Sequence, residues 1–262
     1  MDTALLVALG VAVGVLMGLT GSSGVALTVP ALSYMGLTYQ QSVGASLLVD
    51  LVASLSTLAV YLNAHDVDGR YAAMLGLGAL AGAQLGSHVA VRAPEPPLEI
   101  LFAASSFYFA YTSLGNAVSG SDKGLLPQIR SRIGELRPRA RRMAAVLSSV
   151  GIGLITGLIG ASGGIMFAVV ISAISDMPIR KVVGTATAAM ALSALGGATA
   201  YFYLGQLNIW VALVVGSSAL VSGFAAARLA HKIHPRLVYL ALSALFTIVA
   251  ILELLRALSV LI

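Results

Sequence analysis

The sequence predicts an all-α polytopic membrane protein built from two inverted repeats of five helical segments each. Hydrophobic residues make up 58% of the 262 residues and charged residues only 10%, with a mean hydropathy of +0.96. This composition leaves too little polar surface to cover a water-soluble globule. The chain also contains an internal duplication, and an odd number of segments per copy inverts one half relative to the other.

The duplication is carried by two pairs of matching segments. GLTGSSGVALTVP, which begins at Gly18, recurs as GLIGASGGIMFAVV from Gly157. VGASLLVDLVASLSTLAVYL, from Val43, recurs as VGTATAAMALSALGGATAYFY from Val183, and the offset is 139 to 140 residues. In an apolar chain this pattern is typical of transporters, in which inverted repeats form alternately open gates around one site.

Each half contains five apolar segments. They lie at residues 3–20, 23–36, 41–63, 70–91 and 98–118, and again at 143–159, 163–176, 181–204, 208–230 and 237–261. A full crossing needs about 20 helical residues, so the third, fourth and fifth of each half qualify whereas the second is short. Glycine-rich turns interrupt the first two segments of each half, which could form a re-entrant hairpin or two crossings.

The charges predict the domain organisation and the orientation. We expect a first membrane repeat over residues 1–118, a basic linker over 119–142 and a second repeat over 143–262. The linker holds Lys123, Arg130, Arg132, Arg137, Arg139, Arg141 and Arg142. By the positive-inside rule it is cytoplasmic, where its arginines could also contact anionic lipid, and alternation then places both termini outside the cytoplasm. Only Arg92 and Arg256 of the 15 cations lie outside in this topology.

The two glycine-serine turns are candidate anion-binding sites. A helix that begins just after GSSG or GASGG presents free backbone N–H groups and the positive end of its dipole. Ser22, Ser23 and Ser162 add hydroxyl donors. The alternative is that small residues only permit close helix packing, which is the role expected of the glycines spaced by four. These are Gly10, Gly14, Gly18, Gly78, Gly82 and Gly86.

Asp50 is an acidic residue near the middle of the third segment. An unpaired carboxylate at that depth costs several kcal/mol, so Asp50 should face a cavity, pair, or stay protonated. Its counterpart in the second repeat is Met190, so the carboxyl group is not part of the shared scaffold. A carboxyl group that loads and releases a proton would suit proton-coupled transport, whereas a protonated Asp50 bonded to Gln84 or to a helix backbone would be structural.

The segments GLTGSSGVALTVPAL, VGASLLVDLVASLS and NAHDVDGRYAAMLGLGALAGAQLGSHVA resemble the first repeat of the sulfite exporter TauE/SafE family. GLIGASGGIMFAVV and VVGTATAAMALSALGG resemble its second repeat, and the likeness covers nearly the whole chain apart from the linker. The resemblance implies a bacterial inner-membrane permease that exports sulfite, organosulfonates or related small anions. The family's turns are usually richer in glycine than the one that holds Ser22 and Ser23.

Carried over by position, the resemblance implies a substrate site formed by the two turns and the helix starts that follow them. Its residues are Gly21, Ser22, Ser23, Gly24, Ser46, Ala161, Ser162, Gly163, Gly164, Thr185 and Thr187. From their own chemistry, Gln84 is a further lining candidate and Asp50 is the candidate proton-coupling residue. The hydroxyl groups of Ser46, Thr185 and Thr187 could bond a sulfonate oxygen. Serine and threonine in membrane helices also bond their own preceding carbonyls, and both roles stay open.

Two other classes of protein share features with this sequence. GSSG and GASG fit the GxSG pattern of rhomboid intramembrane proteases, which need a histidine at membrane depth. His231 and His234 lie in a basic loop, and the pattern occurs in both halves, so we do not expect an enzyme or a catalytic residue. A non-transporting membrane assembly protein would use the same small-residue faces without a cavity.

The sequence predicts no cofactor, metal or nucleic-acid partner. The absence of cysteine excludes a thiolate metal site, and His65, Asp66 and Asp68 share a short loop with too few ligands. The sequence pI of about 9.7 comes from loops of a membrane protein. The expected partners are a small anionic substrate and membrane lipid, and the sequence makes no prediction of the oligomeric state.

Overall fold

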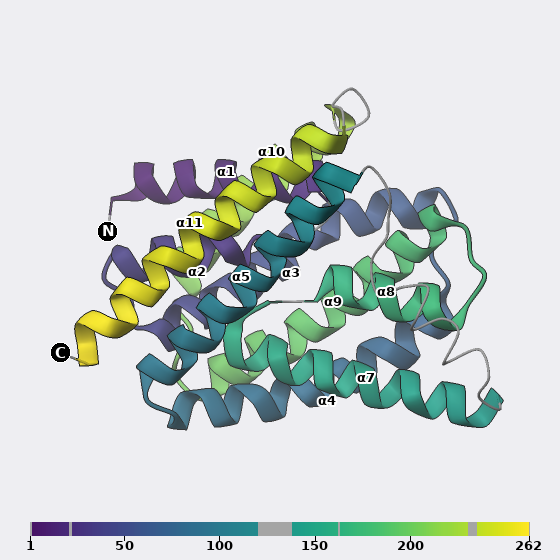
Figure 1. The fold of residues 1–262 in the computed structure, drawn as a ribbon, viewed down its shortest axis with the longest axis horizontal. Coiled ribbons are helices and arrows are strands. Elements are labelled where there is room, and N and C mark those ends of the chain that lie inside the picture. The colour runs from purple at the N-terminus through teal and green to yellow at the C-terminus, as the bar shows by residue number, and fades with distance from the viewer. Residues whose placement is uncertain (1, 21–22, 120–137, 162, 230–234, 262) are drawn as a thin grey trace.

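The structure is a computed structural model that describes residues 2–20, 23–119, 138–161, 163–229 and 235–261 (Figure 1). These residues form ten α-helices and no β-strand. The first half contains α1 (Thr3–Thr20), α2 (Val25–Tyr34), α3 (Tyr39–Asn63), α4 (Gly69–Arg92) and α5 (Glu95–Ser119), and the second contains α7 (Pro138–Ile159), α8 (Gly164–Ile174), α9 (Ile179–Tyr203), α10 (Ile209–Leu229) and α11 (Pro235–Leu261). The all-α class is confirmed, and each expected segment is a helix.

Local signals explain where the long helices begin. The side chain of Thr38 accepts a hydrogen bond from the backbone of Gln41, which returns one to Thr38, so α3 starts with a capping box. Asp68 accepts from two backbone N–H groups at the start of α4. Helix α7 begins at Pro138, five residues before the expected start of the second repeat. Proline is well tolerated at a first helical position, and the arginines that follow favour a helix.

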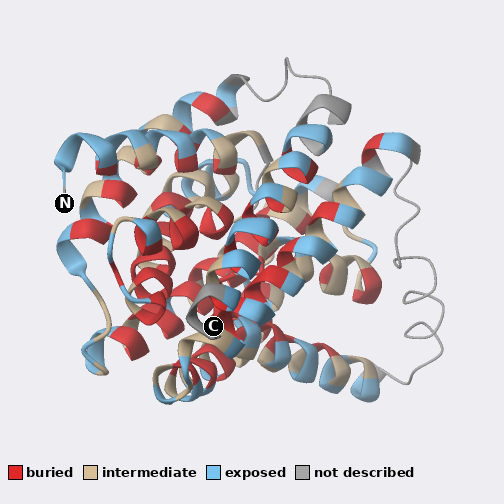
Figure 2. Cartoon of the chain, turned by 60° about the vertical axis from the view of Figure 1, so that its left-hand side comes forward, coloured by how far each residue is buried: buried red, intermediate tan, exposed pale blue. Residues whose placement is uncertain are grey.

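Six of the described helices, α3, α4, α7, α9, α10 and α11, are long and apolar enough to cross a membrane. Helices α2 and α8 contain 10 and 11 residues, so they extend only about 15 Å, half of the roughly 30 Å hydrocarbon core. Large apolar side chains such as Leu77, Leu85 and Val221 are exposed. Exposed positions lie on the outward faces of the helices (Figure 2). Lipid is the solvent that suits such a surface, and the chain is a multi-pass membrane protein.

Helices of the two halves pack together in matched pairs. Helix α4 packs along α7, and α10, the counterpart of α4, packs along α1, the counterpart of α7. Helices α3 and α9 pack on each other, as do α5 and α11, which run in opposite directions (Figure 1). Helices α1 and α7 also run in opposite directions in Figure 1. This exchange of contacts is the arrangement expected of inverted repeats.

Glycine residues allow close packing within two helix pairs, α1 with α10 and α4 with α7, at equivalent points of the repeat. A Cβ atom added at Gly14 of α1 would lie 2.2 Å from the carbonyl oxygen of Ala219 of α10, and one added at Gly153 of α7 would lie 2.0 Å from that of Ala79 of α4. Such distances leave room only for glycine. Close packing is therefore confirmed for most of the glycines spaced by four, namely Gly10, Gly14, Gly78, Gly82 and Gly86.

The central pair, α3 and α9, crosses with the start of each helix against the end of the other. A Cβ at Gly44, near the start of α3, would lie 2.9 Å from the Cβ of Tyr201 near the end of α9. A Cβ at Gly184, near the start of α9, would lie 3.0 Å from the Cβ of Tyr61 near the end of α3. The repeated VG motifs therefore set the spacing of this antiparallel pair, which carries Asp50 into the centre.

Candidate functional site

The carboxyl group of Asp50 lies against the end of the first glycine-serine turn. The backbone N–H of Gly24 donates to its Oδ1 atom at 3.0 Å, and the hydroxyl of Ser23 donates to Oδ2. Asp50 is completely buried in α3. A buried carboxylate is tolerated only when such donors replace its water, so Asp50 pairs with the turn rather than standing alone.

This contact places a negative group at the start of α2. The helix begins at Val25, directly after Gly24, and its first N–H groups carry partial positive charge. The hydroxyl of Thr28 donates to the carbonyl of Gly24 at 3.0 Å, which ties the turn to the helix. The carboxyl group of Asp50, which comes from α3, therefore lies at the start of α2. The sequence predicted that a substrate anion would bind at such a helix start.

The second turn is held by a different set of bonds. Gly160 and Gly163 have φ angles of +80° and +77°, which favour glycine. The hydroxyl of Thr156 donates to the carbonyl oxygen of Ala161 at 2.8 Å. The hydroxyl of Tyr201 donates to the carbonyl oxygen of Gly157 at 2.8 Å. Both bonds are accepted by carbonyl groups, one at the end of α7 and one in the turn.

Helix α8 follows Gly163 as α2 follows Gly24. The position in α9 that matches Asp50 is Met190, which is buried in a hydrophobic cluster. Met190 therefore cannot supply at the start of α8 the carboxylate that Asp50 supplies at the start of α2.

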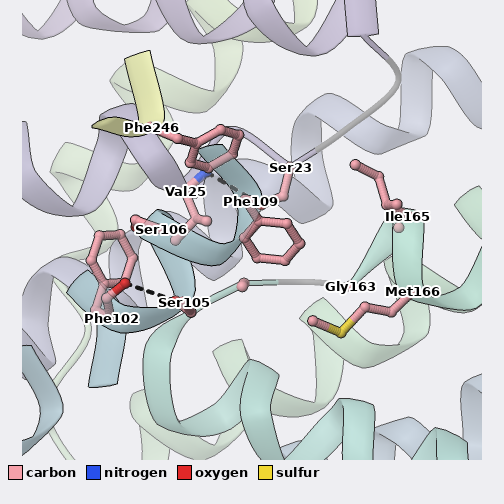
Figure 3. Close-up of a pocket in the computed structure, with 12 residues that line it drawn as sticks. Ser23, Val25, Phe102, Ser105, Ser106, Phe109, Gly163, Ile165, Met166 and Phe246 are labelled. Carbon is pink, nitrogen blue, oxygen red and sulfur yellow. Dashed lines mark hydrogen bonds between the residues drawn. The ribbon is translucent and has the colours of Figure 1, made fainter. Parts of the chain in front are cut away.

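Both turns line one cavity of about 40 Å³ (Figure 3). Ser23 and Val25 line it from the first turn and α2, and Ala161, Gly163 and Gly164 from the second turn and α8. This volume is far below the roughly 300–1,000 Å³ of sites for drug-sized ligands, so the cavity suits a ligand of a few heavy atoms. Two segments about 140 residues apart therefore meet at one space.

Helices α5 and α11 supply a cavity wall that sequence reasoning missed. Phe102, Ser105, Ser106 and Phe109 line it from α5, and Phe246 lines it from α11. The adjacent polar residues Ser105 and Ser106, within an apolar segment, could have indicated a cavity-facing side of α5. The phenylalanines gave no such indication, because a cavity-facing aromatic residue cannot be told from a lipid-facing one by its position in an apolar segment.

The other expected site residues lie in separate places. The hydroxyl of Ser46 donates to the Val43 carbonyl, and a Cβ on Gly160 would lie 2.8 Å from its oxygen, so Ser46 borders the second turn. The Gln84 amide donates to Thr199 rather than to Asp50. Gly21, Ser22 and Ser162 lie outside the described residues.

Thr185 and Thr187 bond backbone groups. The Thr185 oxygen accepts the N–H of Asp68 at 2.9 Å and donates to the Lys181 carbonyl at 2.6 Å. Thr187 donates to the Val183 carbonyl at 2.9 Å. Neither lines the cavity, and Thr185 fastens the start of α9 to the loop between α3 and α4.

The surroundings of Ser23 differ from those of a serine nucleophile. Its hydroxyl donates to Asp50, whereas His88 bonds the Gln84 carbonyl and His65 lies exposed in the loop after α3. His231 and His234 lie outside the described residues. Within the described part of the chain, no three His, Cys, Asp or Glu side chains form a group that could hold a metal ion.

A multi-helix membrane fold with a small cavity between two glycine-rich turns is typical of membrane transport proteins. The family model for "Sulfite exporter TauE/SafE" matches residues 6–252, and the chain belongs to this family.

Several relatives carry transporter names. "Probable membrane transporter protein YunE" of Bacillus subtilis is 22% identical over 90% of this chain and 91% of its own length. "Probable membrane transporter protein MJ0441" of Methanocaldococcus jannaschii is 23% identical over 96% of this chain and 95% of its own. "Probable membrane transporter protein YdhB" of Bacillus subtilis is 31% identical over 44% of this chain and 46% of its own. No solved structure matches significantly.

Proposed function

We propose that this protein exports a small sulfur oxyanion, sulfite or an organosulfonate, by alternating access between inverted repeats. The observation that carries the proposal is the cavity shared by the two glycine-serine turns. Family membership supports transport as the activity, and the family description supports a sulfur oxyanion as the substrate.

The start of α8 is the anion's first docking point in this proposal. Its first N–H groups carry partial positive charge, and Gly163 and Gly164, at this helix start, line the cavity. A sulfonate there would replace its water with these donors and with hydroxyl groups. Ser23, Ser105 and Ser106 line the same space, and Ser22 and Ser162 of the turns are further candidates.

Asp50 competes with the substrate for the start of α2. While its carboxylate holds Ser23 and the N–H of Gly24, those donors are engaged. Two negative groups repel each other strongly in a buried site. A proton that binds the Asp50 carboxylate removes this repulsion and weakens its hold on the donors, so that the anion can take them. Proton binding and anion binding are thereby coupled.

The apolar wall favours an organosulfonate over sulfite as the better ligand. Phe102, Phe109 and Phe246 face the cavity together with Met166. A sulfonate carries an apolar group that could contact these side chains while its oxygens meet the serines and the start of α8. Sulfite has no such group and would gain nothing from the aromatic wall.

The orientation is part of the proposal. The chain lies in the bacterial inner membrane with its termini outside, its basic linker in the cytoplasm near anionic lipid, and the region around Thr185 facing inward. Export then requires the cavity to open first toward the side of the linker and afterwards toward the side of the termini.

Transport of methanesulfonate by the purified protein in liposomes tests the function. This anion stays ionised near neutral pH and brings no proton of its own. Labelled methanesulfonate should enter vesicles loaded with unlabelled methanesulfonate, and external sulfite should compete with it.

Ser23→Ala should lower the apparent affinity roughly tenfold or more, because a hydrogen bond to a charged group contributes about 1.5–3 kcal/mol. Ser54→Ala is the matched control, since Ser54 is also buried in the membrane but bonds its own helix. Absence of counterflow, or equal effects of the two variants, would refute the assignment.

A further inference from the structure

A second buried acidic group lies where the start of α5 meets the end of α11. Nε of Arg256 lies 3.1 Å from Oε1 of Glu99, which joins the two helices. Glu253, one turn before Arg256 on α11, is completely buried, and Glu99 is 1% exposed. Neither carboxyl oxygen of Glu253 has a hydrogen-bond partner among the described residues.

The charges of this group do not balance if both carboxyl groups are ionised. Two carboxylates would then share the interior with the single guanidinium of Arg256, whose Nε already meets Glu99. An ionised buried carboxylate without hydrogen bonds costs several kcal/mol. One proton bound between Glu99 and Glu253 makes the group neutral, since it leaves one carboxylate for the guanidinium.

A tyrosine hydroxyl lies in the same buried region. The hydroxyl of Tyr39, from α3, is fully buried and has no hydrogen-bond partner in the described part of the chain. It lies within electrostatic range of both Glu253 and Glu99. A neutral hydroxyl brings no positive charge, so it does not balance the second carboxylate if both carboxyl groups are ionised.

Among the described residues, Arg256 is the cation that acts on Glu253, and the other ionisable groups that act on it are Glu99 and Tyr39. Glu95 of α5 acts on Glu99, and Tyr201 of α9 acts on Tyr39. Tyr34 donates to the carbonyl of Leu252, and Tyr201 to that of Gly157. Helix α7 carries its described ionisable groups, Arg139, Arg141 and Arg142, in its first two turns, away from the contact of its end with the second turn.

The group is connected to the cavity through α5. Phe102 lies one turn after Glu99, lines the cavity, and meets the ring of Tyr39 edge to face with a centroid distance of 6.4 Å. Phe246 lies two turns before Glu253 on α11 and lines the same cavity. A separation of α5 from α11 would therefore open the cavity wall and expose the two carboxyl groups together.

We propose that Glu253 and Glu99 form a proton-binding site, that the bound proton keeps this end of α5 and α11 together, and that the proton leaves when the helices separate. The step is the reversible reaction of a carboxylate with one proton to give a carboxylic acid. This site is distinct from Asp50, which lies in the centre of α3, and it does not depend on the substrate.

Infrared spectroscopy of the purified protein tests proton binding without any transport. The wild type should show the carbonyl band of a buried protonated carboxylic acid at neutral pH. The band should be lost in Glu253→Gln. It should also be lost in Glu99→Gln, because Arg256 can then pair with an ionised Glu253.

The control variant is Glu95→Gln, which changes an acid on the same helix outside the proposed pair and should keep the band. Absence of the band from the wild type, its persistence in Glu253→Gln or Glu99→Gln, or its loss in Asp50→Asn instead would overturn the proposal. If Glu253→Gln does not fold, the infrared spectra of the wild type and of Glu99→Gln still test the proposal.

Thiol labelling tests the movement, since the chain contains no cysteine. Leu98→Cys introduces a thiol at a buried position of α5, and Pro94→Cys introduces one at an exposed position in the preceding loop. The labelling rate at Leu98→Cys relative to Pro94→Cys should rise at least about tenfold from mildly acidic to alkaline buffer. It should not rise when Glu253→Gln is added, and a ratio independent of pH in both backgrounds would overturn the proposal. Failure of methanesulfonate transport would leave this result unaffected.

Discussion

The backbone N–H of Gly24 donates a 3.0 Å hydrogen bond to Oδ1 of Asp50, across the gap between α2 and α3. This bond puts the protein's own carboxylate at a helix start that an anion could otherwise occupy. At the matching helix start, after Gly163, the residue equivalent to Asp50 is Met190, which carries no acid. Two turns of similar sequence therefore offer an incoming anion two different environments.

Asp50→Asn should separate anion binding from the proton gradient. Asparagine keeps an oxygen that accepts the N–H of Gly24 but can no longer change charge. We expect methanesulfonate counterflow to persist, the apparent affinity to rise several-fold, and acceleration by a pH gradient across the vesicle membrane to disappear. Asp66→Asn, in the loop after α3, is the control and should behave like the wild type. A wild-type gradient response in Asp50→Asn would rule out coupling through this residue.

Gly163→Ala should destabilise the second turn. Its φ angle is +77°, and an added Cβ would lie 2.5 Å from Cγ2 of Ile152. Strain of this kind costs about 1–3 kcal/mol. Gly151→Ala is the matched control, because Gly151 is helical and a Cβ there would meet nothing within 4 Å. Thermal unfolding in detergent should show a lower midpoint for Gly163→Ala than for Gly151→Ala, and equal midpoints would contradict the described turn.

Gly44→Ala and Gly184→Ala should have similar effects, although they lie in different halves. In each, the new methyl group would press on a carbonyl oxygen in the turn just after the other central helix. The oxygen is that of Gln206 for Gly44→Ala, at 2.5 Å, and that of Asp66 for Gly184→Ala, at 2.2 Å. Overpacking typically costs about 1–3 kcal/mol. Unfolding midpoints measured beside Gly115→Ala, whose Cβ would meet nothing within 4 Å, check this. A loss in only one of the two variants would argue against equivalent crossings.

The proposed orientation is testable by single-cysteine labelling in intact cells. His65→Cys, in the exposed loop after α3, should react only with reagents that cross the membrane. Tyr203→Cys, at the 84% exposed end of α9, should react with reagents that do not cross it. The reverse pattern would place the termini in the cytoplasm and invert the direction in which the cavity opens.

The helices could be predicted from the sequence because the signals are local. Apolar segments long enough to cross, capping residues such as Thr38 and Asp68, and glycines at the breaks all act within one or two turns. The repeat also located both glycine-serine turns, and the structure brings these turns to one cavity.

Sequence alone determined the membrane class and the order of the described helices, since composition and periodicity record how each segment meets its solvent. The tertiary structure decided which groups meet. Asp50 pairs with Ser23 and Gly24, Gln84 pairs with Thr199, and Glu99 pairs with Arg256 from the other half of the chain. Contacts between distant segments depend on how whole helices cross, and no local pattern of residues carries that information.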